Sequence, residues 1–102
     1  MNEIEQYRKD SADWMGLEYV GQWKWKPDQD HNQMAMMEDK LIEEGCETYC
    51  SIHRTSLTKT VQYDYRIVND KTDNRAINIS QESKCIAFMK AWSEYYKQTK
   101  GL

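Results

Sequence analysis

The chain has 102 residues and a net charge of −3, which suits a single domain over residues 1–102 and lacks the basic excess typical of nucleic-acid binding. Hydrophobic residues make up 39% of the chain, and four tryptophans and seven tyrosines supply large side chains for a core. No apolar run reaches the length of a membrane span, and the acidic start does not resemble a signal peptide, so we expect a cytoplasmic protein.

The N-terminal segment predicts a helix over about residues 3–15. Asn2 can cap its first turn, Gly16 can end it, and apolar residues recur between them at three- to four-residue spacing. Large apolar and polar side chains then alternate over residues 17–26, which predicts a strand. Pro27, the only proline, cannot continue a central strand and should end it.

A second helix is predicted after this strand, with Asp28 or Asp30 as its cap and Gly45 as its end. Residues 46–55 and 61–68 both alternate with period two, and the turn-like residues 56–59 lie between them. We therefore expect an antiparallel hairpin.

The C-terminal third predicts a long helix. Residues 76–79 form either a short edge strand or a hydrophobic staple, and Ser80 can cap the helix over about 81–99. Phe88 is expected at the margin of its apolar face. The side chains expected to point inward are those of Cys85, Ile86, Met89, Trp92, Tyr95 and Tyr96.

Together the elements predict an α+β fold in the order α-β-α-β-β-(β)-α. Its sheet has three or four mainly antiparallel strands. Because the outer strand positions also carry aromatic side chains, we expect this sheet to be packed between helices that cover both faces, at least in part.

Three short segments resemble the phage ABA-sandwich domain, a family of small bacteriophage and prophage proteins. They are Trp14-Met15-Gly16-Leu17, Trp25-Lys26-Pro27 and residues 85–91. The resemblance implies a phage origin and a sheet between helices. It supplies no catalytic residue and no cofactor.

Two clusters could carry chemistry. Cys46, Cys50 and His53 invite a metal interpretation, but in a strand the two cysteines lie about 13 Å apart and His53 points to the other face. Asp28 and Asp30 with His31 could move protons or hold a divalent ion, but acids at a helix start are more simply capping residues. We expect buried, inert thiols, no metal, no cofactor and no enzymatic activity.

Binding residues are predicted in three places. Trp25 could stack on a nucleotide with Lys24 and Lys26 nearby, although strand alternation places the indole and the lysines on opposite faces. The hairpin offers a basic group for a nucleotide or an acidic surface, namely Arg54, Lys59 and Arg66. The last helix offers an aromatic group for a partner or for a second copy, namely Trp92, Tyr95 and Tyr96.

The leading functional hypothesis follows from the phage resemblance and the small size. It is a non-enzymatic protein that binds a host protein and thereby inhibits an antiviral defence. One alternative is a protein that sequesters a nucleotide signal, with an interface between copies as one candidate location for the site. Another is a minor structural or assembly protein of the phage particle.

Overall fold

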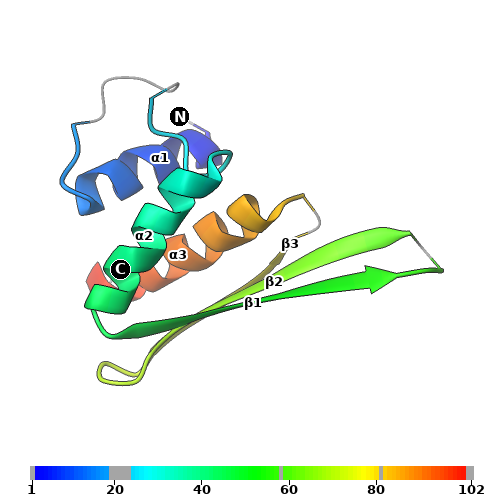
Figure 1. The fold of residues 1–102 in the computed structure, drawn as a ribbon. Coiled ribbons are helices and arrows are strands. Elements are labelled where there is room, and N and C mark those ends of the chain that lie inside the picture. The colour runs from blue at the N-terminus through cyan, green and yellow to red at the C-terminus, as the bar shows by residue number, and fades with distance from the viewer. Residues whose placement is uncertain (1, 19–23, 58, 81, 101–102) are drawn as a thin grey trace.

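The computed structural model describes residues 2–18, 24–57, 59–80 and 82–100. These residues form three helices and a three-stranded antiparallel sheet in the order α-α-β-β-β-α (Figure 1). The elements are α1 (Glu3–Trp14), α2 (His31–Glu43), β1 (Cys46–Thr55), β2 (Thr60–Asn69), β3 (Asn74–Ser80) and α3 (Lys84–Lys100). The predicted α+β class is confirmed.

The first two helices begin and end where local sequence signals place them. The Asn2 side chain accepts a hydrogen bond from the Glu5 N–H at 2.8 Å, and Asp30 accepts from two N–H groups in the first turn of α2. Beyond the helix ends, Gly16 and Gly45 have φ angles of 74° and 94°, which side chains disfavour. These predictions are confirmed because capping depends on neighbouring residues only.

The start of α3 differs from the prediction. Ser80 pairs with Tyr63 as the last residue of β3, and its Oγ accepts from the Glu82 N–H at 3.1 Å. The cap is Ser83, whose Oγ accepts from the Ile86 N–H at 3.0 Å. The helix begins later because the sheet holds the chain extended as far as Ser80.

The hairpin and the edge strand are confirmed. β1 pairs with β2 from Cys46 opposite Asn69 to Thr55 opposite Thr60. β3 pairs with the other side of β2, so the strand order is β1-β2-β3. Residues 76–79 therefore belong to a strand, the first of the two alternatives considered for them.

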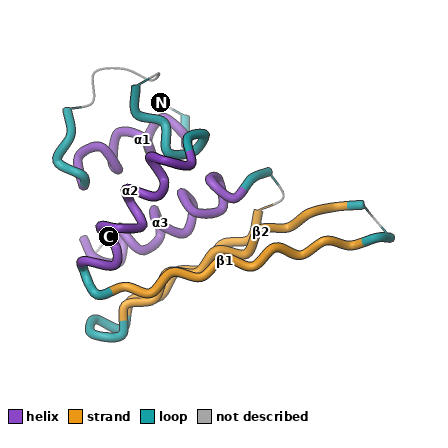
Figure 2. Tube along the Cα trace, in the orientation of Figure 1, coloured by secondary structure: helices purple, strands orange, loops and turns teal. Residues whose placement is uncertain are grey.

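The core lies between the sheet and the helices. α2 and α3 pack directly on the sheet, and α1 packs on these two helices (Figures 1 and 2). Phe88 is fully buried at the centre of the core, not at its margin, and its ring meets Tyr65 edge-on at 5.0 Å. Tyr65 faces inward because β2 turns its odd-numbered residues toward the helices.

The expected helices on both faces of the sheet are not present. All three described helices lie on one face (Figure 1), and the other face carries side chains with large exposed fractions. The register places Tyr49, Arg66 and Ile77 beside one another on that face. The sheet therefore has a helix-covered face and an open face.

The strand predicted over residues 17–26 is not supported where it can be judged. Its centre, residues 19–23 with Trp23, lies outside the described residues. The flanks at 17–18 and 24–26 are not in a strand. Instead, Trp25 is buried against α1, where its indole N–H donates to the Ser11 Oγ at 2.8 Å.

The outer half of the β1–β2 hairpin extends beyond the helices as an arm (Figures 1 and 2). Ile52 is 51% exposed although it lies on the helix-side face, and Leu57 at the turn is 98% exposed. No helix in the described part of the chain is both long and apolar enough to cross a membrane.

Candidate functional site

The open face of the sheet is the largest candidate site. Its central rows run across all three strands, with Tyr49, Arg66 and Ile77 in one row and Ser51, Asp64 and Ile79 in the next. The exposed fractions of Tyr49, Ile77 and Ile79 are 50%, 56% and 58%. Large apolar side chains thus surround a charged centre.

An ion pair forms that centre. The Arg66 Nη2 lies 3.1 Å from the Asp64 Oδ2, and the Arg66 Nε donates to the Asp64 Oδ1 at 3.3 Å. The hydrogen bond from Arg66 raises the pKa of its guanidinium further, so the group stays charged. Residue Asp64 is only 8% exposed, so its carboxylate holds the guanidinium in place on the surface.

Next to the ion pair is a shallow depression of about 370 Å³, lined by Tyr49, Ser51, Arg66 and Val68. The Tyr49 hydroxyl donates to Glu47, and this hydrogen bond raises the tyrosine pKa. Tyrosine, arginine and isoleucine around a polar centre are residues typical of protein–protein interfaces. Asp64 and Tyr49 are each engaged by a neighbouring side chain, Arg66 and Glu47 respectively.

Trp25 does not present its indole to a ligand. The residue is 7% exposed and belongs to the core. The Lys26 N–H donates to the Gln33 Oε1 at 2.6 Å, and the Gln33 Nε2 donates to the Lys24 carbonyl at 2.7 Å. The exposed Lys24 and half-buried Lys26 are therefore tied to α2 through their backbones, and the proposed aromatic–basic stacking site is not formed.

The basic residues of the hairpin do not form one site. Arg54 pairs with Val61 on the helix-side face, whereas Arg66 lies on the open face. Lys59 lies in the turn with a φ of 54°. Because β-strand side chains alternate, the even-numbered Arg54 of β1 and the even-numbered Arg66 of β2 fall on opposite faces in this register.

The aromatic group of α3 is largely core. Trp92 is fully buried and Tyr95 is 2% exposed, while the half-buried Tyr96 stacks on Trp92 at 4.8 Å. Trp14 of α1 continues this row, with its ring centre 5.4 Å from that of Trp92. Lys40 lies over the Trp14 ring at 4.8 Å.

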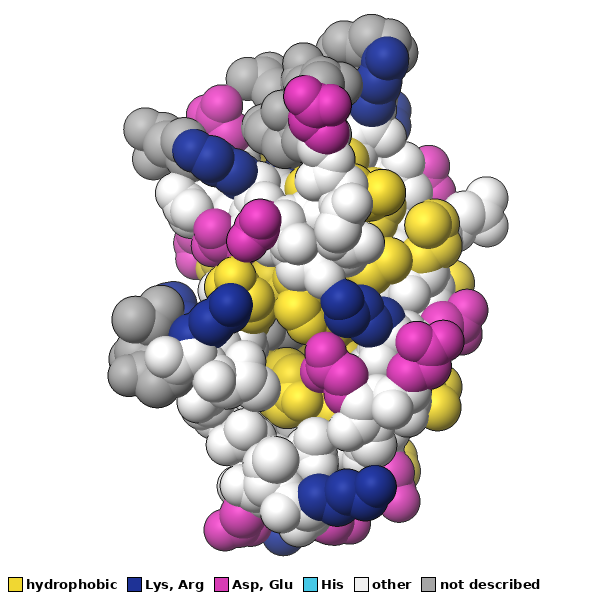
Figure 3. Space-filling view, turned by 90° about the vertical axis from the view of Figure 1, so that its left-hand side faces the viewer, with side chains coloured by type: hydrophobic (Ala, Val, Ile, Leu, Met, Phe, Trp, Pro, Cys, Tyr) yellow, Lys and Arg dark blue, Asp and Glu magenta, His cyan; other side chains and the backbone are white. Residues whose placement is uncertain are grey.

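Figure 3 shows the end of the molecule where the C-terminal ends of the helices meet, with hydrophobic side chains between charged ones. The aromatic row fastens α1 to α3, so these rings are not a free binding surface.

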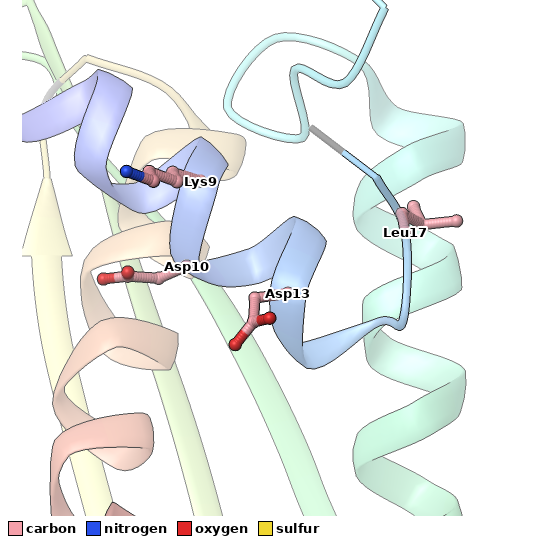
Figure 4. Close-up of a pocket in the computed structure, with 4 residues that line it drawn as sticks. All are labelled: Lys9, Asp10, Asp13 and Leu17. Carbon is pink, nitrogen blue, oxygen red and sulfur yellow. The ribbon is translucent and has the colours of Figure 1, made fainter. Parts of the chain in front are cut away.

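A second depression, of about 240 Å³, lies along the solvent side of α1 and the residues after it (Figure 4). Its lining residues are Lys9, Asp10, Asp13 and Leu17. In Figure 4 the Lys9 and Asp10 side chains point the same way and that of Asp13 points downward, so the three do not converge on one point. The Asp10 Oδ1 already accepts from the Gln6 Nε2 at 2.7 Å. Nothing in this depression indicates a catalytic or metal site.

The three cysteines are free thiols that form no disulfide with one another. Cys46 and Cys85 are buried and Cys50 is exposed, and burial raises the pKa of each thiol. His53 lies on the open face, away from Cys46 and Cys50. Within the described ranges, no three His, Cys, Asp or Glu side chains are grouped to hold a metal ion.

Sequence reasoning predicted Arg66 as a binding residue but missed the apolar residues of the open face, Tyr49, Ile77 and Ile79. Ile77 and Ile79 share a period-two face opposite Ala76, which is a visible signal that a strand there has two apolar faces. The expected second layer of helices would have covered them. No protein-family model, curated protein or solved structure matches this chain, so the phage resemblance stays a prediction.

Proposed function

We propose that the protein binds another protein stoichiometrically through the open face of its sheet and is not an enzyme. The observation that carries the proposal is the set of exposed apolar side chains around the Asp64–Arg66 pair. Single exposed apolar residues are common, but a contiguous patch on one face is typical of an interaction surface.

The partner we propose is a host protein in the cytoplasm of a bacterium. The phage resemblance supports a role in which binding blocks a component of an antiviral defence. A small domain with a flat, mixed surface can occlude such a component without chemistry of its own.

The open face suits a protein better than a nucleotide. Its depression is shallow, and a phosphate would have to displace the Asp64 carboxylate from Arg66. The aromatic residue expected to stack on a base, Trp25, is buried. The nucleotide alternative therefore has no site among the described residues that the geometry favours.

The test is capture from a host lysate with the immobilised protein and with two matched variants. Ile77→Lys places a charge in the open face, and Met36→Lys does the same on α2, where Met36 is 47% exposed. Ile77→Lys should weaken capture of a given host protein by at least about tenfold, and Met36→Lys should not.

Melting temperatures of both variants should match the parent, which separates binding from folding. Equal capture by the parent and by Ile77→Lys would exclude the open face as the binding surface. Capture of phage particle proteins in place of host proteins would favour the assembly alternative.

A further inference from the structure

The two edge strands of the sheet, β3 and β1, differ in how far α3 covers their outward backbone groups. On the β3 edge, the Arg75 N–H donates to the Gln98 Oε1 at 3.0 Å, and the Arg75 carbonyl accepts from the Gln98 Nε2 at 2.7 Å. The side-chain amide of α3 thus occupies the backbone groups that another strand would use. α3 also packs along β3, which protects this edge further.

Through the strand registers, the same two hydrogen bonds also show which backbone groups of β1 point away from β2, toward the outer edge of the sheet. In an antiparallel strand, the N–H and C=O of one residue point to the same side, and the side alternates along the chain. Because the backbone groups of Arg75 point away from β2, the registers place five β1 residues with their backbone groups toward the free edge. They are Cys46, Thr48, Cys50, Ile52 and Arg54.

Charge is distributed unequally along this free edge. The arm, residues 51–63, contains His53, Arg54 and Lys59 and no acidic residue. The end of α2 and the start of β1, residues 38–47, contain five acidic residues and one lysine. An antiparallel pair of β1 strands from two copies would place each basic arm beside the acidic base of the other copy.

The arm and the acidic base each also carry an exposed apolar side chain. Ile52 on the arm is 51% exposed, because none of the three described helices extends over the arm. Ile42, in the acidic base, is 59% exposed on the side of α2 turned away from Lys40 and α1. Ile52 is thus an exposed apolar residue on β1, and Ile42 is another in the last turn of α2, close in sequence to the start of β1.

We infer that two copies of this chain pair through β1, antiparallel, to form a continuous six-stranded sheet. The two-fold axis is perpendicular to the sheet, so both sets of helices lie on one side and both open faces on the other. The pairing satisfies the free backbone groups and places opposite charges together twice. It does not depend on the proposed host-protein binding, because it concerns the purified chain alone.

Proline variants test the use of the backbone edge by sedimentation of the purified protein over a range of concentrations. Cys50→Pro removes an N–H that points to the free edge and leaves the β1–β2 hydrogen bonds in place. Ile77→Pro does the same on the β3 edge. The parent and Ile77→Pro should form dimers with similar dissociation constants. The dissociation constant of the Cys50→Pro dimer should be at least about tenfold higher.

Charge variants provide a test that does not rely on proline. One chain carries Glu43→Lys with Glu47→Lys, and the other carries Arg54→Glu with Lys59→Asp, since Asp tolerates the positive φ of residue 59. Each chain alone should dimerise more weakly, because the first chain's base loses its net negative charge and the second chain's acidic arm is repelled by its acidic base. An equal mixture of the two should dimerise more tightly than either chain alone, because the acidic base of the second chain then lies beside the basic arm of the first.

A parent chain that sediments as a monomer at every concentration would overturn the inference. A dimer that survives both Cys50→Pro and the charge variants would overturn it as well, because the copies would then meet elsewhere. Failure of either kind leaves the host-capture experiment with Ile77→Lys unaffected, so the two proposals fail separately.

Discussion

Arg8 and Asp28 form a two-pronged ion pair that joins α1 to the loop in front of α2. The Arg8 Nε lies 2.7 Å from the Asp28 Oδ1, and the Arg8 Nη2 lies 2.9 Å from the Oδ2. The exposed fractions of the two side chains are 13% and 2%. This contact and the Trp25–Ser11 hydrogen bond both join α1 to the loop in front of α2.

Arg8→Ala should lower the free energy of unfolding by about 3–5 kcal/mol, because it leaves the buried Asp28 carboxylate without its partner. Urea denaturation followed by circular dichroism measures the change. The control is Arg75→Ala, whose pair with Asp73 is 3.7 Å long and largely exposed, and which should change stability by about 0–1 kcal/mol. Equal effects of the two variants would contradict a structural role for the Arg8–Asp28 pair.

Ser11→Ala should destabilise the protein by about 1–3 kcal/mol, because the buried indole N–H of Trp25 loses its acceptor. Trp25→Ala should lower the free energy of unfolding further, by about 3–5 kcal/mol, because it also opens a cavity. Thermal unfolding checks both, with Ser56→Ala in the exposed turn as the control. A Trp25→Ala protein as stable as the parent would show that the indole is not in the core.

Gln98 variants should affect the β3 edge in a graded way. Gln98→Glu keeps an acceptor for the Arg75 N–H but loses the donor to the Arg75 carbonyl, whereas Gln98→Leu loses both hydrogen bonds. Each lost bond should cost about 0.5–1.5 kcal/mol. Amide hydrogen exchange at Arg75 should quicken in Gln98→Leu and stay slow in Gln98→Glu. Slow exchange in both variants would mean that another group protects this edge.

Stability should fall at alkaline pH. Burial raises the pKa values of Cys46 and Cys85 above 9.0 and those of Tyr7, Tyr65 and Tyr95 above 10.0. A raised folded-state pKa stabilises the fold fully below the unfolded-state value, and this contribution is lost as pH rises above it toward the folded-state value.

Urea midpoints should therefore be constant near neutral pH and decline above pH 9. Each such group contributes a slope of at most about 1.4 kcal/mol per pH unit. Tyr65→Phe removes one of these groups and should flatten the decline above pH 10. A midpoint independent of pH up to 11 would contradict the burial of these side chains.

Much of the local structure could be predicted because its causes lie within a few residues. Asn2 and Asp30 cap helices, and alternation over residues 46–55 and 60–69 produces a hairpin. The start of α3 could not be predicted in the same way. Whether Ser80 or Ser83 caps the helix depends on how far β3 pairs with β2, which is a contact between distant residues.

The candidate site was harder to predict than the fold. Of the residues expected to bind a partner, Arg66 lies on the open face, while Trp25, Trp92 and Tyr95 are core residues. Composition identifies an aromatic side chain as large and able to bind, but the same property makes it a good core residue. Only the packing of neighbouring elements distinguishes the two.

The sequence by itself determined the first two helices with their caps and the alternating strands of the hairpin, because capping and side-chain alternation are short-range properties of the chain. The tertiary structure alone decided that all three helices lie on one face of the sheet. It also decided which edge is closed, since Gln98 reaches Arg75 from 23 residues away. Which face and which edge of the sheet stay exposed depends on which surfaces meet after the chain folds, and residue spacing does not encode this directly.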